Sequence, residues 1–251
     1  MKVRYVQTDI IWADPKANLE SLEKLFSNLP DADLYVLPEM FTTGFAVLPA
    51  GVAEKDTTTL EWMKSMAASR NAAIAGSVST ETADGQFCNR FYFVRPDGTF
   101  DFYDKKHLFT FSGEDKRYTA GDRRVIVEWR GIRYLLLVCY DLRFPVWIRN
   151  RGDYDAIICV ASWPVQRITA WRTLVRARAI ENQCWFAAVN RCGDDPGNHY
   201  DGATALIDPF GEAPEEILDR EGVCTGHIDM DVLNAFREAF PVLNDADRFE
   251  L

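Results

Sequence analysis

Segments with a continuous apolar pattern alternate along the chain with segments that repeat apolar residues at helical spacing. The first apolar run covers residues 3–11 and predicts a strand. Asp14 followed by Pro15 then predicts a helix start, because Asp accepts hydrogen bonds at an N-cap and Pro suits the first helical position. Apolar residues at helical spacing continue to Leu29. The chain therefore begins with a strand and a helix.

Further strands and helices follow by the same criteria. Residues 58–61 (TTLE) have the form of a capping box and predict the start of a helix with one apolar face. Residues 95–98 (RPDG) and 130–131 (RG) lie between apolar runs and predict hairpin turns. The other expected elements are a helix over 166–181 and strands over 34–37, 72–78, 87–94, 99–105, 125–127, 133–139, 156–161, 184–189, 203–207 and 223–228.

Two features of this pattern predict the architecture. The strands expected over 34–37, 72–78, 133–139 and 156–161 are apolar at both odd and even positions, which indicates burial on both faces. Hairpins lie among β-α units, so the sheets should be mixed rather than purely parallel. We therefore predict an α/β fold, a four-layer α-β-β-α sandwich of two mixed sheets, formed by residues 1–251 as a single domain.

Composition and charge narrow the classes of partner. The 251 residues contain 28 Lys and Arg against 38 Asp and Glu, a formal net charge of −10. An acidic surface repels phosphate groups, so we expect no nucleic acid and no membrane as partners. Arg172, Arg176 and Arg178 form a basic stripe, which we expect to be a solvated or interfacial helix face.

The cysteines and the N-terminal sequence indicate the cellular compartment in which the protein is expected. The chain opens without the pattern of a secretory signal, and no apolar run reaches the length of about 18 residues that spans a bilayer. The six cysteines are scattered and include no CxxC pair. Neither they nor the three histidines cluster at the spacing of zinc ligands. We expect six free thiols, no metal and a cytoplasmic location.

Three reactive residues end buried strands, where ligand sites of α/β sheets collect. Glu39 follows the strand over 34–37, Lys105 ends the strand over 99–105, and Cys139 ends the strand over 133–139. Each alone has an ordinary explanation, as a capping acid, a surface charge or a small core residue. Together they supply a general base, a cation and a nucleophile, a complete set for acyl transfer if the sheets bring these strand ends together.

The chain resembles the nitrilase (carbon-nitrogen hydrolase) superfamily from its first strand to about residue 230. Residues 37–40 (LPEM) match the glutamate motif of that family, residues 103–108 (YDKKHL) its lysine motif, and residues 138–145 (VCYDLRFP) its cysteine motif. The three motifs stand in the family's order and at its separations. The spacing to the histidine of the lysine motif assigns the family's lysine to Lys105, not Lys106.

The resemblance implies a mechanism that needs no metal and no organic cofactor. Cys139, expected to have thiolate character, would attack an amide carbon and form a thioester, while Glu39 would take up its proton and later activate water. Lys105 and the backbone N–H of Tyr140 would hold the oxyanion. Glu114 stands where many members carry a second active-site glutamate, and would orient Lys105 or help protonate the leaving group. The alternative for Glu114 is an ordinary surface acid.

Further stretches resemble the bacterial omega-amidase branch of the family. These are residues 40–45 (MFTTGF), 107–109 (HLF), 170–174 (AWRTL) and 177–182 (ARAIEN). This resemblance implies a small-molecule amide substrate, chiefly 2-oxoglutaramate or 2-oxosuccinamate, and a homodimer paired through helices near 177–182. Another branch, namely an aliphatic amidase, a carbamoylase or a nitrilase, would use the same triad. A non-catalytic ligand-binding member should have lost a triad residue, and this chain retains all three.

Substrate recognition requires further residues near the same rim. In a protein with a net charge of −10, the carboxylate of an omega-amide substrate needs an Arg or Lys, and Arg suits it best. Arg167, beyond the strand over 156–161, is our candidate, and the alternative is a solvent-facing Arg on a first helical turn. Trp163 and Phe41 are candidates for lining the pocket. Arg143, four residues past the cysteine, is expected to be structural.

Overall fold

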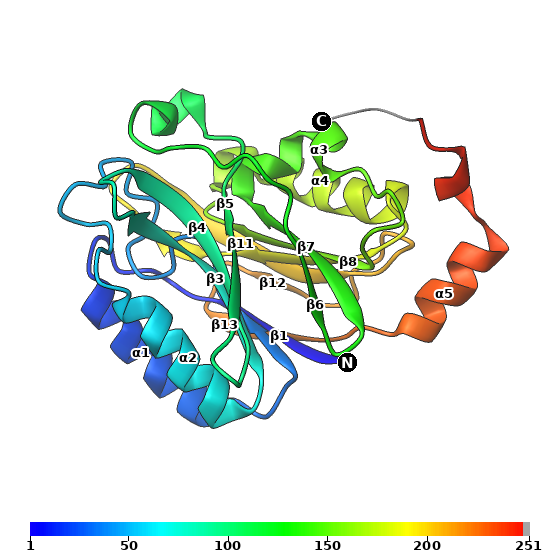
Figure 1. The fold of residues 1–251 in the computed structure, drawn as a ribbon, viewed down its shortest axis with the longest axis horizontal. Helices are drawn as coiled ribbons and strands as arrows, with labels where there is room; N and C mark the ends of the chain where they lie inside the picture. Colours follow the sequence, from blue (N-terminus) through cyan, green and yellow to red (C-terminus); the bar gives the residue numbers. More distant parts are fainter. Residues whose placement is uncertain (248–251) are drawn as a thin grey trace.

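The computed structural model describes residues 1–247, and its first sheet has six strands in the order β13-β1-β2-β3-β4-β5. The pairs β1·β2 and β2·β3 are parallel and the others antiparallel, so the sheet is mixed. Helices α1 and α2 lie together along its outer face (Figure 1). Their bounds, with those of the strands, are α1 Pro15–Asn28, α2 Thr58–Arg70, β1 Lys2–Gln7, β2 Leu34–Val36, β3 Ala73–Glu81, β4 Phe87–Val94, β5 Phe100–Asp104 and β13 Gly222–His227.

The second sheet has the strand order β10-β11-β9-β8-β7-β6, with β12 paired to β11. Parallel pairs β7·β8 and β8·β9 are joined to antiparallel neighbours, so this sheet is mixed as well. Its strands are β6 Ile126–Trp129, β7 Ile132–Val138, β8 Ala156–Ala161, β9 Trp185–Asn190, β10 Cys192–Asp194, β11 His199–Ile207 and β12 Glu216–Leu218. The helices of this half are α3 Pro145–Ile148, α4 Ile168–Glu181 and α5 Met230–Ala239. Among residues 1–247, no helix is both long enough and apolar enough to cross a membrane.

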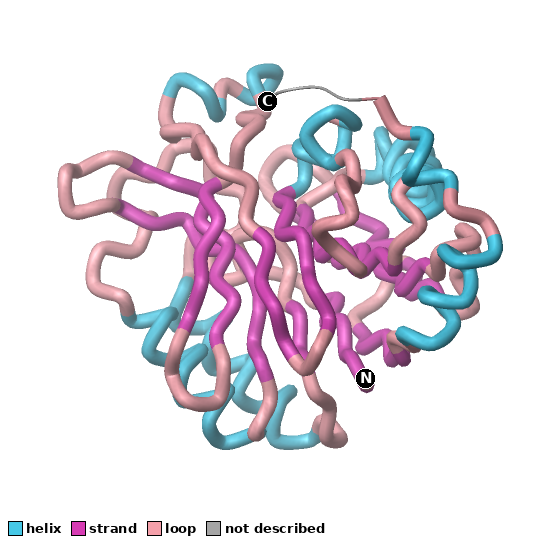
Figure 2. The backbone as a smooth tube through the Cα atoms, turned by 45° about the vertical axis from the view of Figure 1, so that its right-hand side comes forward, coloured by secondary structure: helices cyan, strands magenta, loops and turns pink. Residues whose placement is uncertain are grey.

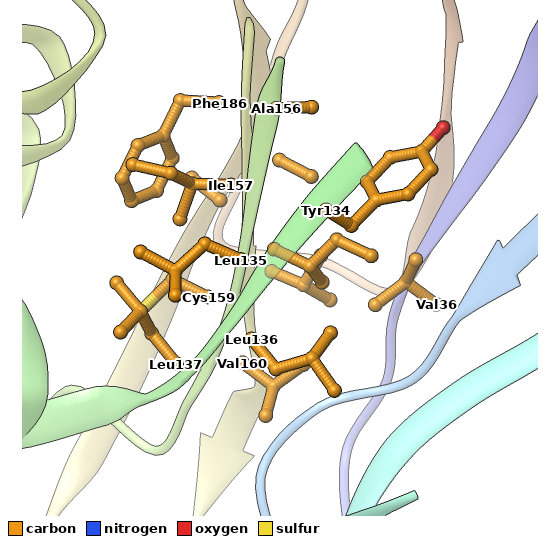
Figure 3. Packing of buried hydrophobic residues seen from close by; sticks show 14 of the residues in the cluster. Val36, Tyr134, Leu135, Leu136, Leu137, Ala156, Ile157, Cys159, Val160 and Phe186 are labelled. Carbon is orange, nitrogen blue, oxygen red and sulfur yellow. The ribbon is translucent and has the colours of Figure 1, made fainter. Parts of the chain in front are cut away.

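The two sheets pack face to face between outer helices, which confirms the predicted four-layer sandwich (Figure 2). Strands β7 and β8 lie inside the sandwich and are buried on both faces. Figure 3 shows Tyr134 of β7 on the side of Val36 from the first sheet, with Leu137 and Ile157 on the opposite side. Because fully burying such a side chain contributes about 1.5–3 kcal/mol, these two strands anchor the core and fix where their ends lie.

The two helices of the first half begin differently. The side chain of Asp14 accepts a hydrogen bond from Ala17 N at 3.0 Å, so α1 begins as predicted. The capping box predicted for α2 is wrong, because its N-cap residue, Thr57, makes no side-chain cap bond. Glu54 accepts from Thr59 N at 2.8 Å instead, and thereby caps α2 from outside the helix. The predicted apolar face is confirmed, with Leu60, Met63 and Ala67 buried.

Candidate active site

Cys139 lies where β7 ends abruptly. The chain passes directly from β7 into a short 3-10 helix, Cys139–Arg143, which we call the cysteine turn. Cys139 itself has a φ of 47°, a left-handed conformation that costs a non-glycine residue energy and persists only where its surroundings enforce it. All six cysteines are free thiols as predicted, and Cys139 alone among them is partly exposed. The backbone thus presents one thiol at the edge of the sandwich.

Lys105 lies between two buried carboxylates. Its Nζ is 3.0 Å from Glu39 Oε1, and 3.0 and 3.1 Å from the two carboxylate oxygens of Glu114. Lys105 is 1% exposed, and both glutamates are fully buried. Lys105 directly follows β5, Glu39 comes shortly after β2, and Glu114 begins a short turn. The structure therefore brings these residues together, and it excludes the alternative that Glu114 is a surface acid.

The charges of this cluster determine its resting protonation. Burial would lower the pKa of Lys105, but the carboxylates of Glu114 and Glu39 outweigh it and hold that pKa well above its ordinary value. Burial raises the pKa of Glu114, and Lys105 opposes the rise. Desolvation, reinforced by the Glu39 carboxylate, raises the pKa of the Cys139 thiol well above its ordinary value. The direction of this shift is opposite to the expected thiolate character, because it favours the thiol and calls for a base that takes its proton.

Glu39 is oriented by two partners that no sequence motif marks. Its Oε1 accepts from Asn89 Nδ2 of β4 at 2.8 Å, and its Oε2 accepts from the backbone N–H of Ser162 beyond β8 at 2.8 Å. Asn89 is fully buried in a strand whose other residues, apart from Arg90, are aromatic or apolar, and a polar residue at this buried position is the sequence signal that could have identified it. Asn89 belongs to the first sheet and Ser162 follows a strand of the second. The Glu39 carboxylate is therefore held between the two sheets.

Arg178 on α4 holds the cysteine turn from the outer side. Its Nε and Nη2 donate to the carbonyl oxygen of Leu142 at 3.2 and 3.1 Å. Arg178 is only 6% exposed, so the predicted solvated or interfacial face is wrong for this residue. The carbonyl groups of a short turn lack intrahelical partners, and a buried guanidinium satisfies one of them here.

A cavity of about 650 Å³ opens at this edge of the sandwich, and Glu39, Lys105 and Cys139 contribute to its wall. Two cations besides Lys105 reach it, Arg143 and Arg167. Much of the remaining wall is apolar or aromatic, including Trp12, Phe45, Leu48, Phe109, Phe111 and Pro164. An apolar pocket with a few convergent polar groups is the usual form of a small-molecule site.

The predicted pocket residues on the β8 side lie in this cavity. Trp163 lines it and donates from Nε1 to the carbonyl oxygen of Arg167 at 2.8 Å. The guanidinium of Arg167 is 5.2 Å from the centroid of the Phe109 ring. Arg143, expected to be structural, also lines the cavity, with its guanidinium 4.8 Å from the Trp163 ring centroid. The cavity therefore holds two arginines where the sequence analysis proposed one.

Phe41 does not line the cavity, so its predicted place in the pocket is wrong. It is 1% exposed and packs in the core beneath α2, with its ring centroid 6.1 Å from that of Trp62. Phe45, four residues later, lines the cavity instead, and Lys105 Nζ lies 5.2 Å from its ring centroid. The chain turns directly after Glu39, where Met40 has a φ of 45°, and the next residue, Phe41, packs in the core.

Comparisons with known proteins agree with this geometry. The chain is 45% identical to omega-amidase YafV of Escherichia coli (strain K12), with 100% of this chain and 98% of that protein covered. It is 34% identical to 2-oxoglutaramate amidase of Bacillus subtilis (strain 168), covering 96% and 95%. The crystal structure of XC1258 from Xanthomonas campestris, a CN-hydrolase superfamily protein with an arsenic adduct in its active site, matches with a TM-score of 0.97 at 44% identity, covering 100% and 98%.

The family model for carbon-nitrogen hydrolases matches residues 2–238, nearly the whole chain. This match confirms the resemblance first seen in the glutamate, lysine and cysteine motifs. Each motif contributes at least one residue to the wall of the cavity, namely Glu39, Lys105, and Cys139 with Tyr140 and Arg143. The chain belongs to the carbon-nitrogen hydrolase family.

Proposed function

We propose that this protein hydrolyses the omega-amide of 2-oxo dicarboxylic acid monoamides, chiefly 2-oxoglutaramate and 2-oxosuccinamate, to the acid and ammonia. The observation that carries the proposal is a thiol, Cys139, beside a buried base and cation, in a cavity that also holds two arginines. The thiol, base and cation suit the scissile amide, and the two arginines suit the carboxylate at the other end of the substrate. Relatives named omega-amidase and 2-oxoglutaramate amidase support this choice of substrate.

Acylation follows from the resting protonation of the cluster. Cys139 Sγ attacks the amide carbon as its proton passes to Glu39, whose carboxylate is held in place by Asn89 and Ser162. The amide oxygen becomes an oxyanion and accepts from Lys105 Nζ and the backbone N–H of Tyr140, in the first turn of a 3-10 helix. One such donor contributes about 3 kcal/mol to transition-state stabilisation. The C–N bond then breaks, the nitrogen takes the proton, and ammonia leaves a thioester on Cys139.

Deacylation uses the same groups in the reverse sense. Glu39 accepts a proton from water as the water oxygen attacks the thioester carbon, and Lys105 again binds the oxyanion. The C–S bond breaks, the sulfur takes back its proton, and the carboxylic acid leaves. Glu114 acts through Lys105: it accepts from Lys105 Nζ and from Phe109 N at 2.6 Å, which fixes the ammonium in place. These steps use protein side chains, one backbone N–H group and water.

Ammonia release from a panel of substrates tests the proposed function. The wild-type enzyme should release ammonia faster from 2-oxoglutaramate than from glutamine, a nitrile or an N-carbamoyl amino acid. Glutamine is an informative comparison because it has the same amide and carboxylate but an amino group in place of the oxo group. Preference for one of the other three compounds would assign the protein to a different branch. Release from none of them would favour a non-catalytic ligand-binding member.

Arg167→Met should raise KM for 2-oxoglutaramate about tenfold or more, as expected when a charged hydrogen bond of roughly 1.5–3 kcal/mol is lost. Steady-state kinetics on a neutral short-chain amide should be nearly unchanged. Arg143→Met is the matched comparison, because Arg143 also reaches the cavity. Selective loss in Arg143→Met alone would assign the carboxylate to that residue and contradict the role of Arg167. Equal losses on both substrates in Arg167→Met would make Arg167 structural.

The proposal extends to one domain over residues 1–251 that forms a homodimer in the cytoplasm. Ile180 at the end of α4 is 51% exposed, and the neighbouring Phe210 and Phe240 are 51% and 61% exposed. Apolar side chains grouped on a surface in this way are typical of contacts between protein chains. Six free cysteines support a reducing compartment.

A further inference from the structure

Asp141 is a fully buried carboxylate that takes no part in the chemistry proposed above. Its Oδ1 accepts from the backbone N–H of His107 at 2.9 Å and from the ring Nδ1 of His107 at 2.8 Å. Its Oδ2 accepts from Tyr103 Oη at 2.8 Å and from the backbone N–H of Val138 at 2.9 Å. An ionised carboxylate only accepts, so Nδ1 of His107 carries the hydrogen in this contact. Asp141 therefore receives four hydrogen bonds.

These donors lie close in sequence to Lys105 and Cys139, two residues of the proposed reaction. Tyr103 and His107 stand two residues before and two residues after Lys105, and Val138 directly precedes Cys139. Tyr103 Oη also accepts from the backbone N–H of the residue after Lys105, at 3.1 Å. Among residues 1–247, every hydrogen bond between residues 103–107 and residues 138–144 ends on Asp141. The side chain of Asp141 thus links residues 103–107, which contain Lys105, to the cysteine turn.

Within the described residues, no other polar contact links these two segments. Glu39 and Glu114 hold the ammonium of Lys105, but neither glutamate side chain hydrogen-bonds to the cysteine turn. Arg178 holds that turn to α4 instead. The ring of His107 stacks on Phe144, with centroids 3.7 Å apart and planes 6° apart, which adds packing along the same junction.

We infer that Asp141 is a positioning residue that sets Lys105 Nζ relative to Cys139 Sγ. The inference rests on the proposed function, because it concerns attack by Cys139 and oxyanion binding by Lys105. The positive φ of Cys139 needs enforcement by its surroundings, and the hydrogen bond from Val138 N to Asp141 supplies it at the preceding residue. A displacement of about 1 Å between reacting groups lowers rates on the order of 100-fold.

Asp141→Asn tests the inference with almost no change in size. The Asn Nδ2 cannot accept from Val138 N–H, so the bond at the end of β7 is lost while those to His107 can remain. We expect kcat for 2-oxoglutaramate to fall on the order of 100-fold with KM within about threefold of wild type. Alkylation of Cys139 by iodoacetamide, followed by mass spectrometry, should slow about tenfold, because the thiol is displaced from Glu39 and Lys105.

Two further variants make the test decisive. Asp31→Asn changes a carboxylate whose side chain is 94% exposed, and should leave kcat and alkylation unchanged. Tyr103→Phe removes one of the four hydrogen bonds and should lower kcat about threefold to tenfold. Folded Asp141→Asn with kcat within threefold of wild type, or with only KM raised, would overturn the inference. If Asp141→Asn does not fold, Tyr103→Phe decides the test. A kcat of Tyr103→Phe within twofold of wild type would then overturn the inference.

Failure of the inference and failure of the proposed function give different results. If the wild-type enzyme releases no ammonia from 2-oxoglutaramate, the proposed function fails. The alkylation rate of Cys139 involves no amide substrate and still reports whether Asp141 positions the thiol. If the wild-type enzyme is active and Asp141→Asn has wild-type kinetics, Asp141 contributes only to folding and the proposed function stands.

Discussion

Cys139→Ala should give a folded protein that has lost amidase activity by about 10⁴-fold or more, because the substitution removes the nucleophile of the proposed reaction. Folding should survive for two reasons. The sulfur lies at the cavity rather than in the close-packed core, so its loss leaves little new void. Alanine and cysteine also bear the same cost for the φ of 47° at this position. Ammonia release and the thermal unfolding midpoint measure the two parts of the prediction. Cys139→Ser should likewise be inactive.

Cys184→Ala is the matched control for this experiment. Cys184 is fully buried between α4 and β9, away from the cavity, so its truncation should lower stability while activity per folded molecule stays at the wild-type level. The pair thus separates loss of packing from loss of chemistry. Substantial activity in well-folded Cys139→Ala would refute the assignment of the nucleophile.

The fold was predictable wherever burial left a strong hydrophobic signal. β7 and β8 are apolar on both faces, and the strands predicted from that pattern end within one residue of the observed ones. β10 and β12 were not predicted because each has three residues and, unlike the equally short β2, neither lies in a continuous apolar run. α5 was also missed, although Asp229 caps it by accepting from two backbone N–H groups and its apolar residues recur at helical spacing. The sequence of α5 therefore carries both a capping residue and a helical apolar pattern.

The sequence predicts those residues of the candidate site that stand at strand ends, but not the contacts between them and the rest of the fold. Glu39, Lys105 and Cys139 stand at or just after the ends of predicted strands, and such positions can be read from one sequence. The hydrogen bonds that Asn89 and Ser162 donate to Glu39 cannot be read in this way, because they depend on the order of strands within the sheets and on the packing of the two sheets. The position of Phe45 rather than Phe41 in the pocket could not be predicted for a similar reason. A loop without periodicity gives no sign of the chain reversal at Met40.

Lys105→Ala should lower kcat by several orders of magnitude, whereas Lys106→Ala should cost little. Adjacent residues at a strand end point to opposite sides. The Nζ of Lys105 lies within 3.1 Å of two carboxylates at the cavity. The Nζ of Lys106 lies 5.6 Å from the centroid of the Trp147 ring, in a separate hollow. Steady-state kinetics of the two variants compare neighbouring residues of one type, so general effects of removing a lysine cancel.

Removal of Lys105 also affects stability, and this effect must be separated from catalysis. Without the ammonium, Glu39 and Glu114 lie buried near each other with no cation between them, and breaking a buried pair in this way costs about 3–5 kcal/mol. Lys105→Arg keeps the charge but moves the donor atoms, so it should fold better than Lys105→Ala and remain severely impaired. Recovery of activity in Lys105→Arg would mean that charge alone suffices at this position. Equal losses in Lys105→Ala and Lys106→Ala would mean that Lys106 also binds substrate, since its ammonium has no contact with the cluster that holds Lys105.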